Sequence, residues 1–559
     1  MVKSFLNMLN REITGLHQAA YLLGFFAICS QILALVRDRI LASQFGAGDT
    51  LDLYYSAFRI PDFLFVTVAS IVSISVLIPF LIERLEKDKE SAKEFLDTIF
   101  TFFFCFMIVC GVIAYFVTPY FMALLFPVFA HSASFGDLVS LTRILLLSPI
   151  FLGFSNLLAS ITQIHRRFFI YAISPVVYNI GIIFGIVSLY PIFGLPGLGL
   201  GVVLGAFFHF VIQIPFIVSQ KMLPRFCFPI KFELIKKVIF VSIPRTITVS
   251  SNELAKLFLI TYAALFTTGS VSIFNFSFNL QNVPFSIVGM SYSLAAFPTL
   301  TRLFSGGKHK EFLEQMIISS RHIIFWSIPI SIMFVVLRAQ IVRTILGAGN
   351  FNWDDTRLTA AALAIFTLSL VAQNMTNIFV RSFYSRGKTK VPLIMNIISA
   401  LCIIGFSYIL VHIFQTNFLF RDFIESLFKV SGVPGTVVLM LPLGFTLGVF
   451  VNLITHWVGF AMEFPGYSSP VLKTLFQISG ASLIMGYVAY SSLYIFSHVF
   501  NTDTLFGIFM QGFSSGMCGI AVGIIILHLL GSDELREAWK ALHKKFWKAD
   551  VVVPDAELN

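Results

Sequence analysis

Charged side chains are scarce in this chain. They make up 12% of its 559 residues, whereas apolar residues make up 57% and the mean hydropathy is +0.88. A soluble domain of this length could not stay dissolved with such a surface. The composition therefore excludes a soluble protein and indicates a polytopic integral membrane protein.

Signatures of metal sites and soluble enzymes are also missing. The six cysteines are scattered without a CxxC pair, and no HExxH occurs. The glycine run GLPGLGLGVVLG at 194–205 follows an apolar span rather than a strand, which favours close helix packing over a nucleotide site. The turn RGKTK at 386–390 lacks the first glycine of a phosphate-binding loop, because Ser382 stands there. We therefore expect no catalytic residues, metal or cofactor, and transport or scaffolding remains.

Apolar windows recur along nearly the whole chain. Each is long enough to cross a hydrocarbon core of about 30 Å, which takes about 20 residues. The runs are continuous rather than alternating, which excludes barrel strands. The pattern predicts an all-α bundle of about 14 transmembrane helices. The expected spans are 19–43, 52–82, 97–121, 138–164, 168–190, 196–219, 234–265, 271–301, 320–345, 357–384, 391–414, 434–462, 471–497 and 506–531.

Lysine and arginine gather in alternate connections. They follow the even-numbered expected spans up to the tenth and recur at the C-terminus, whereas YPIFGLPG, TTGSVS and SHVFNTDT contain none. Arg357, Arg421 and Lys429 depart from this pattern. By the positive-inside rule both termini are predicted to be cytoplasmic. The net charge of +10 then indicates topology and attraction to anionic membrane lipids, so no nucleic-acid partner is expected.

Ionisable residues occur at membrane depth in one stretch, 30–62. They are Arg37, Asp38, Arg39, Asp52 and Arg59. Such groups are costly inside a bilayer, so they are expected to pair with one another or to contact something anionic. The alternative for Arg37 and Asp38 is a cap at the end of the first helix. For Arg39 we favour a side chain that extends to the interface.

Five blocks of sequence carry a resemblance to a known family. They are RDRILASQFGAGDTLDLYYSAFRIPDF at 37–63, RRFFIYAISPVVYN at 166–179, GSVSIFNFSFNLQNVPFSIVGMSYSLAAFPTL at 269–300, GAGNFNWDDTRLTAAAL at 347–363 and FYSRGKTKVP at 383–392. In this order they resemble the MurJ/MviN family, the lipid II flippases of bacterial peptidoglycan synthesis. The similarity covers about the first 400 residues.

The resemblance implies both architecture and activity. Two six-helix lobes in a MATE-like arrangement are expected at 1–225 and 226–465, followed by two helices at 466–535 that form a lipid-facing groove and a cytoplasmic tail at 536–559. Such a protein is a transporter and not an enzyme. It moves lipid II from the inner to the outer leaflet of the bacterial cytoplasmic membrane by alternating access. Lipid II, membrane lipids and cell-wall synthesis proteins are the partners that this role implies.

Site roles carry over residue by residue. Arg37 and Arg59 match basic positions expected to bind the diphosphate or sugar. Asp38 and Asp52 match acids that would orient these arginines or form gate pairs that break between states, and Arg39 is placed with this second group.

The chain also departs from the family pattern. Gln31 and Phe65 stand where the family usually has arginine, and Phe278 with Asn279 replaces an Asp-Arg pair, which leaves Asn279 as a neutral substrate contact. Compensation is expected in the seventh span. Arg245 would join the substrate contacts there, and Lys256 with Glu253 would join the gate or orienting group. A spacing of three places Glu253 and Lys256 on one helical face, so the alternative is that they simply pair with each other.

Two other function classes stay open at this point. A flippase or exporter of another cargo on the same fold, such as a polysaccharide-linked lipid or a drug, would explain the altered cationic set. A membrane scaffold would keep the fold and lose the cavity chemistry.

Overall fold

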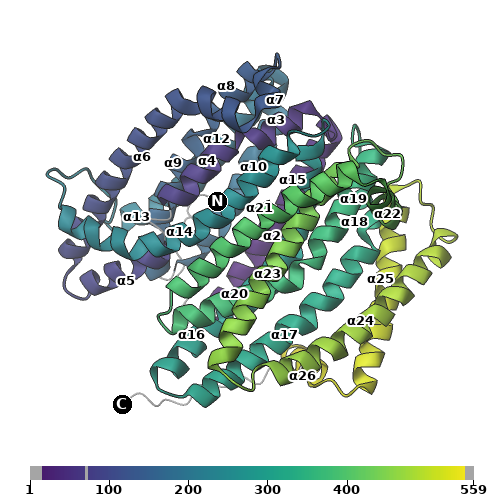
Figure 1. Cartoon of the computed structure of the whole chain (residues 1–559). Coiled ribbons are helices and arrows are strands. Elements are labelled where there is room, and N and C mark those ends of the chain that lie inside the picture. Colours follow the sequence, from purple (N-terminus) through teal and green to yellow (C-terminus); the bar gives the residue numbers. More distant parts are fainter. Residues whose placement is uncertain (1–15, 70–73, 166, 548–559) are drawn as a thin grey trace. The chain divides into compact units, whose positions relative to one another are not determined.

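Helices joined by turns and irregular connections make up the described part of the chain. The computed structural model describes residues 16–69, 74–165 and 167–547, and within these ranges no strand occurs (Figure 1). Eleven helices in the same ranges are long and apolar enough to cross a membrane. The predicted all-α class is confirmed, and the total of about 14 spans stays a prediction that these helices fit.

The helices form two compact units, each made of three chain segments. Unit 1 comprises Met1–Val283, Ile345–Phe366 and Lys388–Asn452, and unit 2 comprises Pro284–Thr344, Thr367–Gly387 and Leu453–Asn559. These units do not follow the lobe boundaries expected from the sequence, and those boundaries stay a prediction.

Unit 1 contains the first half of the chain and two later segments. Its elements are α2 (Leu16–Phe45), α3 (Asp49–Ala57), α4 (Arg59–Leu64), η1 (Phe65–Ala69), α5 (Ile74–Leu85), α6 (Lys89–Leu125), α7 (Pro127–Ala130), α8 (Phe135–Leu145), α9 (Leu147–Ile164), α10 (Phe168–Phe184), η2 (Gly185–Leu189), α11 (Tyr190–Phe193), α12 (Leu195–Val211), α13 (Ile214–Ser219), α14 (Phe232–Ala263), α15 (Ser270–Phe285), α19 (Trp353–Leu368), α21 (Lys390–Thr416), α22 (Phe418–Phe428), η4 (Thr436–Leu439) and α23 (Met440–Glu463).

Several expected spans are interrupted rather than continuous, and two of them contain a π-helical segment shortly after a proline. The span at 52–82 divides into α3, α4 and the π-helical segment η1, and the span at 271–301 divides at the π-helical segment η3 (Ser286–Met290). Both π-helical segments follow a proline, Pro61 and Pro284 respectively. Proline removes a backbone donor and crowds the preceding turn, which disturbs the regular hydrogen-bond ladder. Asp52 and Arg59, in the second half of the charged stretch, therefore lie on short helices whose orientation the uniform apolar pattern could not reveal.

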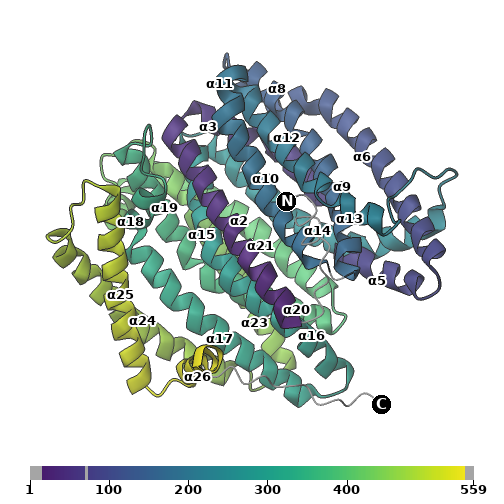
Figure 2. The same ribbon diagram turned by 180° about the vertical axis from the view of Figure 1, so that it is seen from behind.

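The glycine run at 194–205 packs as its sequence predicts. A β-carbon built on Gly185 would lie 2.4 Å from the Cα of Gly201, and one built on Gly181 would lie 2.3 Å from the Cα of Gly205. No side chain fits between α10 and α12 at these positions. The expectation of close helix packing is confirmed, and α2 runs alongside α10 in Figure 2.

Unit 2 holds the C-terminal helices. It contains η3, α16 (Ser291–Ser305), α17 (His309–Val336), α18 (Arg338–Ile345), α20 (Leu370–Ser385), α24 (Ser468–Ser497), α25 (Leu505–Leu529) and α26 (Asp533–Trp547). The two expected terminal spans appear as α24 and α25, which pack along each other (Figure 2). The predicted tail begins with α26, which is seen nearly end-on in both ribbon views, across the direction of α24.

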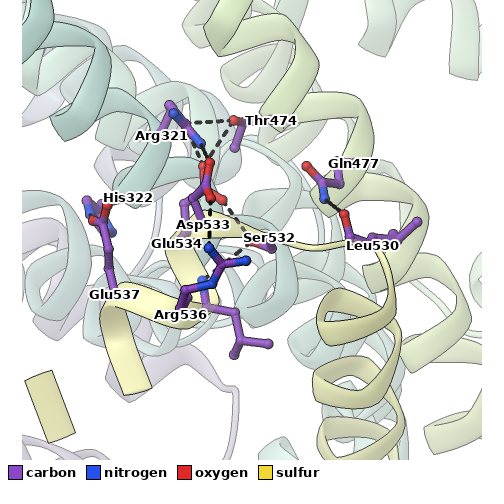
Figure 3. A network of polar contacts seen from close by, with 11 residues as sticks. Arg321, His322, Thr474, Gln477, Leu530, Ser532, Asp533, Glu534, Arg536 and Glu537 are labelled. Atoms are coloured by element: carbon purple, nitrogen blue, oxygen red, sulfur yellow. Dashed lines mark hydrogen bonds and ion pairs between the residues drawn. The ribbon is translucent and has the colours of Figure 1, made fainter. Parts of the chain in front are cut away.

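A polar network attaches α26 to α17 and α24 (Figure 3). Arg321 of α17 donates from Nε to Oε1 of Glu534 at 2.6 Å and contacts Asp533 at 3.3 Å. Thr474 of α24 donates to the same Glu534 oxygen at 3.1 Å, and the Ser532 hydroxyl donates to Oε2 at 2.7 Å. The Glu534 side chain is only 3% exposed, so it would be a costly group to leave unpaired. These contacts hold the beginning of α26 in place.

Acid is expected to release α26. Burial alone would raise the pKa of Glu534, but hydrogen bonds from Ser532 and Arg321, together with the charge of Arg321, hold that pKa below its usual value. A carboxyl pKa that is lower in the folded state adds stability above the unfolded pKa, and this stability is lost as the pH falls through the folded pKa. We expect the amide protection factors across 533–547, the exchange rates corrected for the intrinsic effect of pH, to fall below about pH 4.

The matched variant removes this pH dependence. In Glu534→Gln, the amide protection factors of α26 should already be low at neutral pH and should change little on acidification. Asp503→Asn, in the loop before α25, should behave like the unaltered protein. Slow exchange of α26 in Glu534→Gln would show that another contact attaches the helix.

Candidate functional site

Arg37 and Asp38 form a buried ion pair within α2. Arg37 donates from Nε and Nη2 to one oxygen of Asp38 at 2.9 and 2.8 Å, and from Nη1 to Oδ1 of Asn179 on α10 at 3.2 Å. Asn279 of α15 donates to the other oxygen of Asp38 at 3.1 Å. The pair lies two turns before the end of α2 at Phe45, so it does not cap that helix. Arg37 is thereby held in one orientation, with 20% of its side chain exposed.

Asn179 was not among the residues expected at the site. Its amide group donates to the Ser30 hydroxyl at 3.2 Å while its oxygen accepts from Arg37. The available signal was its place as the last residue of the block at 166–179. An asparagine in an apolar span needs a hydrogen-bond partner, and here Arg37 is one of its partners.

Arg59 is less accessible than the sequence suggested. It lies on α4, donates from Nε to the Tyr55 carbonyl at 3.1 Å and pairs with Asp62 at 3.4 Å. The Arg59 side chain is 6% exposed, whereas that of Asp62 is 41% exposed. Asp62 was also missed as a site residue, although it follows Arg59 by one helical turn in the same charged stretch.

Lys256 and Glu253 lie on α14. The Lys256 ammonium stands 5.2 Å from the ring centroid of Phe278, a cation–π contact, and the contacts of the described chain include no ion pair between Lys256 and Glu253. Both side chains lie within electrostatic reach of Asp62. The side chain of Arg245 lies outside the described part of the chain, so its expected role stays a prediction.

Asp52 does not contact the arginines. Its carboxylate accepts from the backbone N–H of Gly269 at 2.7 Å and from both the N–H and the hydroxyl of Ser272, at 2.8 and 2.6 Å. It therefore caps the start of α15, where unpaired N–H groups and the helix dipole favour a negative charge. Of the two acids expected to orient the arginines, Asp38 contacts one of them, while Asp52 ties α3 to α15.

The turn between α2 and α3 is held by the segment before α19. Asn350 donates from its backbone N–H to the Ser43 carbonyl at 2.9 Å and from its side chain to the Gln44 carbonyl at 2.7 Å, while Asp355 accepts from the N–H of Ala47 at 3.3 Å. We call these contacts the turn closure.

Two neighbouring residues support the turn closure. Gly46 has a φ of +64°, as a tight turn requires, and a β-carbon there would lie 2.6 Å from the Asn350 carbonyl oxygen. Arg39 donates to the Ile345 carbonyl at 3.2 Å. Its guanidinium thus contacts the chain, whereas the sequence favoured a side chain extending to the membrane interface.

Solved structures share this fold. A structure of the lipid II flippase MurJ in an inward closed conformation matches with a TM-score of 0.71 at 22% identity, covering 93% of this chain and 100% of that one. An inward-facing multidrug resistance MATE transporter of the MOP superfamily matches with a TM-score of 0.61 at 18% identity, covering 79% and 96%. The chain therefore shares the helical fold of these two solved structures.

The family follows from sequence. The model of the family described as lipid II flippase MurJ matches residues 41–511, and the chain belongs to this family. A probable lipid II flippase MurJ of Buchnera aphidicola subsp. Schizaphis graminum is 25% identical over 530 residues, covering 93% of this chain and 98% of the relative. Another, from Thermotoga maritima, is 27% identical over 451 residues, covering 76% and 89%.

Proposed function

We propose that this protein is a lipid II flippase, which moves the lipid-linked peptidoglycan precursor from the inner to the outer leaflet by alternating access. Membership of the MurJ family over residues 41–511 is the observation that carries this proposal. The chemistry agrees with it. A diphosphate taken into the bilayer region needs cations to replace its hydration, and a polyprenyl tail needs only apolar surface.

Arg37 is the residue we assign first to the diphosphate. Asp38 and Asn179 hold its guanidinium in a fixed orientation, and part of the side chain stays accessible. Asn279 keeps Asp38 in place from α15. Lys256 supplies a second cation, because its ammonium rests on the face of Phe278 and has no ion pair among the described contacts. These two cations replace part of the positive charge that is missing at Gln31, Phe65 and Asn279.

The turn closure and the Asp52 cap are the contacts that alternating access would have to break. By the orientation predicted from lysine and arginine, both lie on the outer side of the membrane. Each joins the segment around α3 to a helix or loop from later in the chain. Together they hold the outer end closed, and separation of these contacts would open the substrate site toward the outer leaflet.

The same proposal sets location and partners. The protein would reside in the bacterial cytoplasmic membrane with both termini in the cytoplasm. Its substrate would be presented by enzymes that complete lipid II on the inner leaflet and would be used by cell-wall synthesis proteins on the outer side.

Replacement in cells tests the function. We expect this chain to sustain growth when the resident lipid II flippase is depleted, and the purified protein to flip fluorescent lipid II in vesicles. Drug resistance without either activity would instead identify an exporter. If neither activity nor resistance appeared in correctly inserted protein, the scaffold would be the better account.

A further inference from the structure

Asp62 covers a buried arginine. Arg59 is 6% exposed and is held from behind by the Tyr55 carbonyl, whereas Asp62 is 41% exposed and meets the guanidinium at 3.4 Å. The acid is thus the outward member of the pair. An anion that approaches α4 meets a carboxylate before it meets the arginine.

The charges around Asp62 balance. Arg59 and Lys256 are cations, Asp62 and Glu253 are carboxylates, and the other three lie within electrostatic reach of Asp62. Two helices contribute, since Arg59 and Asp62 lie on α4 and the other two residues lie on α14. Without a ligand, Arg59 therefore already has a counter-ion. An anionic ligand can pair with Arg59 only by displacing Asp62.

We propose that Asp62 is a specificity-determining counter-ion of Arg59. A diphosphate displaces Asp62 and binds Arg59, whereas a singly charged phosphate does not. This inference rests on the proposed function and concerns the headgroup that the site accepts. Displacing Asp62 removes a close ion pair and brings two anions near each other, which disfavours any weak competitor. A diphosphate carries enough charge to hold Arg59 and Lys256 together, and a phosphodiester does not.

In a membrane, Asp62 would exclude ordinary phospholipids from Arg59. Phospholipids with one phosphate charge greatly outnumber a lipid-linked precursor, and an uncovered Arg59 would bind them. Asp62 also favours release of the substrate, because its carboxylate can pair with Arg59 again when the diphosphate dissociates. A variant without this charge should bind more tightly and turn over more slowly.

Binding of two matched probes tests the inference. Undecaprenyl methyl phosphate is a phosphodiester monophosphate with one negative charge, whereas an unesterified monophosphate would carry most of a second charge near neutral pH. It shares its tail with undecaprenyl diphosphate, so the two probes differ in headgroup and its charge. In Asp62→Asn, we expect affinity for the monophosphate to rise about tenfold and affinity for the diphosphate to rise less, so that discrimination falls. For lipid II flipping, both KM and kcat should decrease. A merely structural role for Asp62 would not produce that combination.

The gain must depend on Arg59. In the double variant Arg59→Gln with Asp62→Asn, the added affinity for the monophosphate should vanish, because no cation remains to be uncovered. Asp49→Asn removes an exposed acid of α3 and should leave both affinities unchanged. Asp62→Ser serves as a second variant, and thermal unfolding of each purified protein confirms that it is folded.

Two results would overturn the inference. Unchanged discrimination in folded Asp62→Asn and Asp62→Ser would show that Asp62 does not control access to Arg59. A gain that persists in the double variant would assign the effect to another residue. Failure of the unaltered protein to flip lipid II would count against the proposed function, whereas normal flipping with unchanged discrimination would count against Asp62 alone.

Discussion

Replacing Arg37 with alanine is expected to abolish lipid II flipping in vesicles. The structure holds Arg37 in place through two bonds to Asp38 and one to Asn179. Its loss removes a positioned charge for the diphosphate and leaves Asp38 buried without its main partner. Loss of one such contact typically weakens binding by about 100-fold or more. Flipping of fluorescent lipid II, measured at equal amounts of inserted protein, checks this.

Two matched variants separate charge from geometry. Arg37→Lys keeps the charge but cannot reach Asp38 and Asn179 together, so partial activity is expected. Arg143→Ala removes an arginine that stacks on Tyr115 outside the cluster, and it should flip lipid II normally. Unimpaired transport by Arg37→Ala would remove Arg37 from the site.

A disulfide across the turn closure is expected to stop transport reversibly. Asn350 donates a backbone hydrogen bond to Ser43 at 2.9 Å, a close approach of the kind that a disulfide needs, with a Cα separation of about 4.4–6.8 Å. Cysteines at these two positions, in a background that lacks the six native cysteines, should cross-link on oxidation. If the closure must open in each cycle, flipping should fall to background and return on reduction.

The single-cysteine variants provide the control. Each should flip lipid II equally well before and after oxidation. Full transport by the cross-linked protein would show that the turn closure is not a gate. Failure of the cysteine pair to cross-link would mean that the two segments do not stay close in the membrane.

Much of the fold could be predicted because a bilayer imposes simple demands. Apolar windows of the right length had to be helices, and the all-α class follows from that requirement alone. The glycines that face each other at Gly185 and Gly201 were likewise readable as a close helix contact. The helix interruptions after Pro61 and Pro284 were not predicted, because both sides of each interruption are apolar.

The candidate site was predicted only in part. Arg37 and Asp38 stood out because charges are conspicuous in an apolar span, and the structure brings them together with Asn279. Asp52 stood out for the same reason, yet it caps α15. Asn179, which accepts from Arg37, was missed because a single uncharged amide barely changes the hydropathy of an apolar span.

The sequence by itself determined that this is a helical membrane protein, which stretch carries its buried charges, and which family it resembles. These properties depend on composition, on order along the chain and on the cost of placing charge in a bilayer. Only the tertiary structure decided which charge pairs with which. It turned Asp52 toward α15, set Asp62 in front of Arg59 and joined the turn after α2 to Asn350. Such pairings depend on contacts between residues far apart in sequence, and on side-chain directions that short, proline-interrupted helices set.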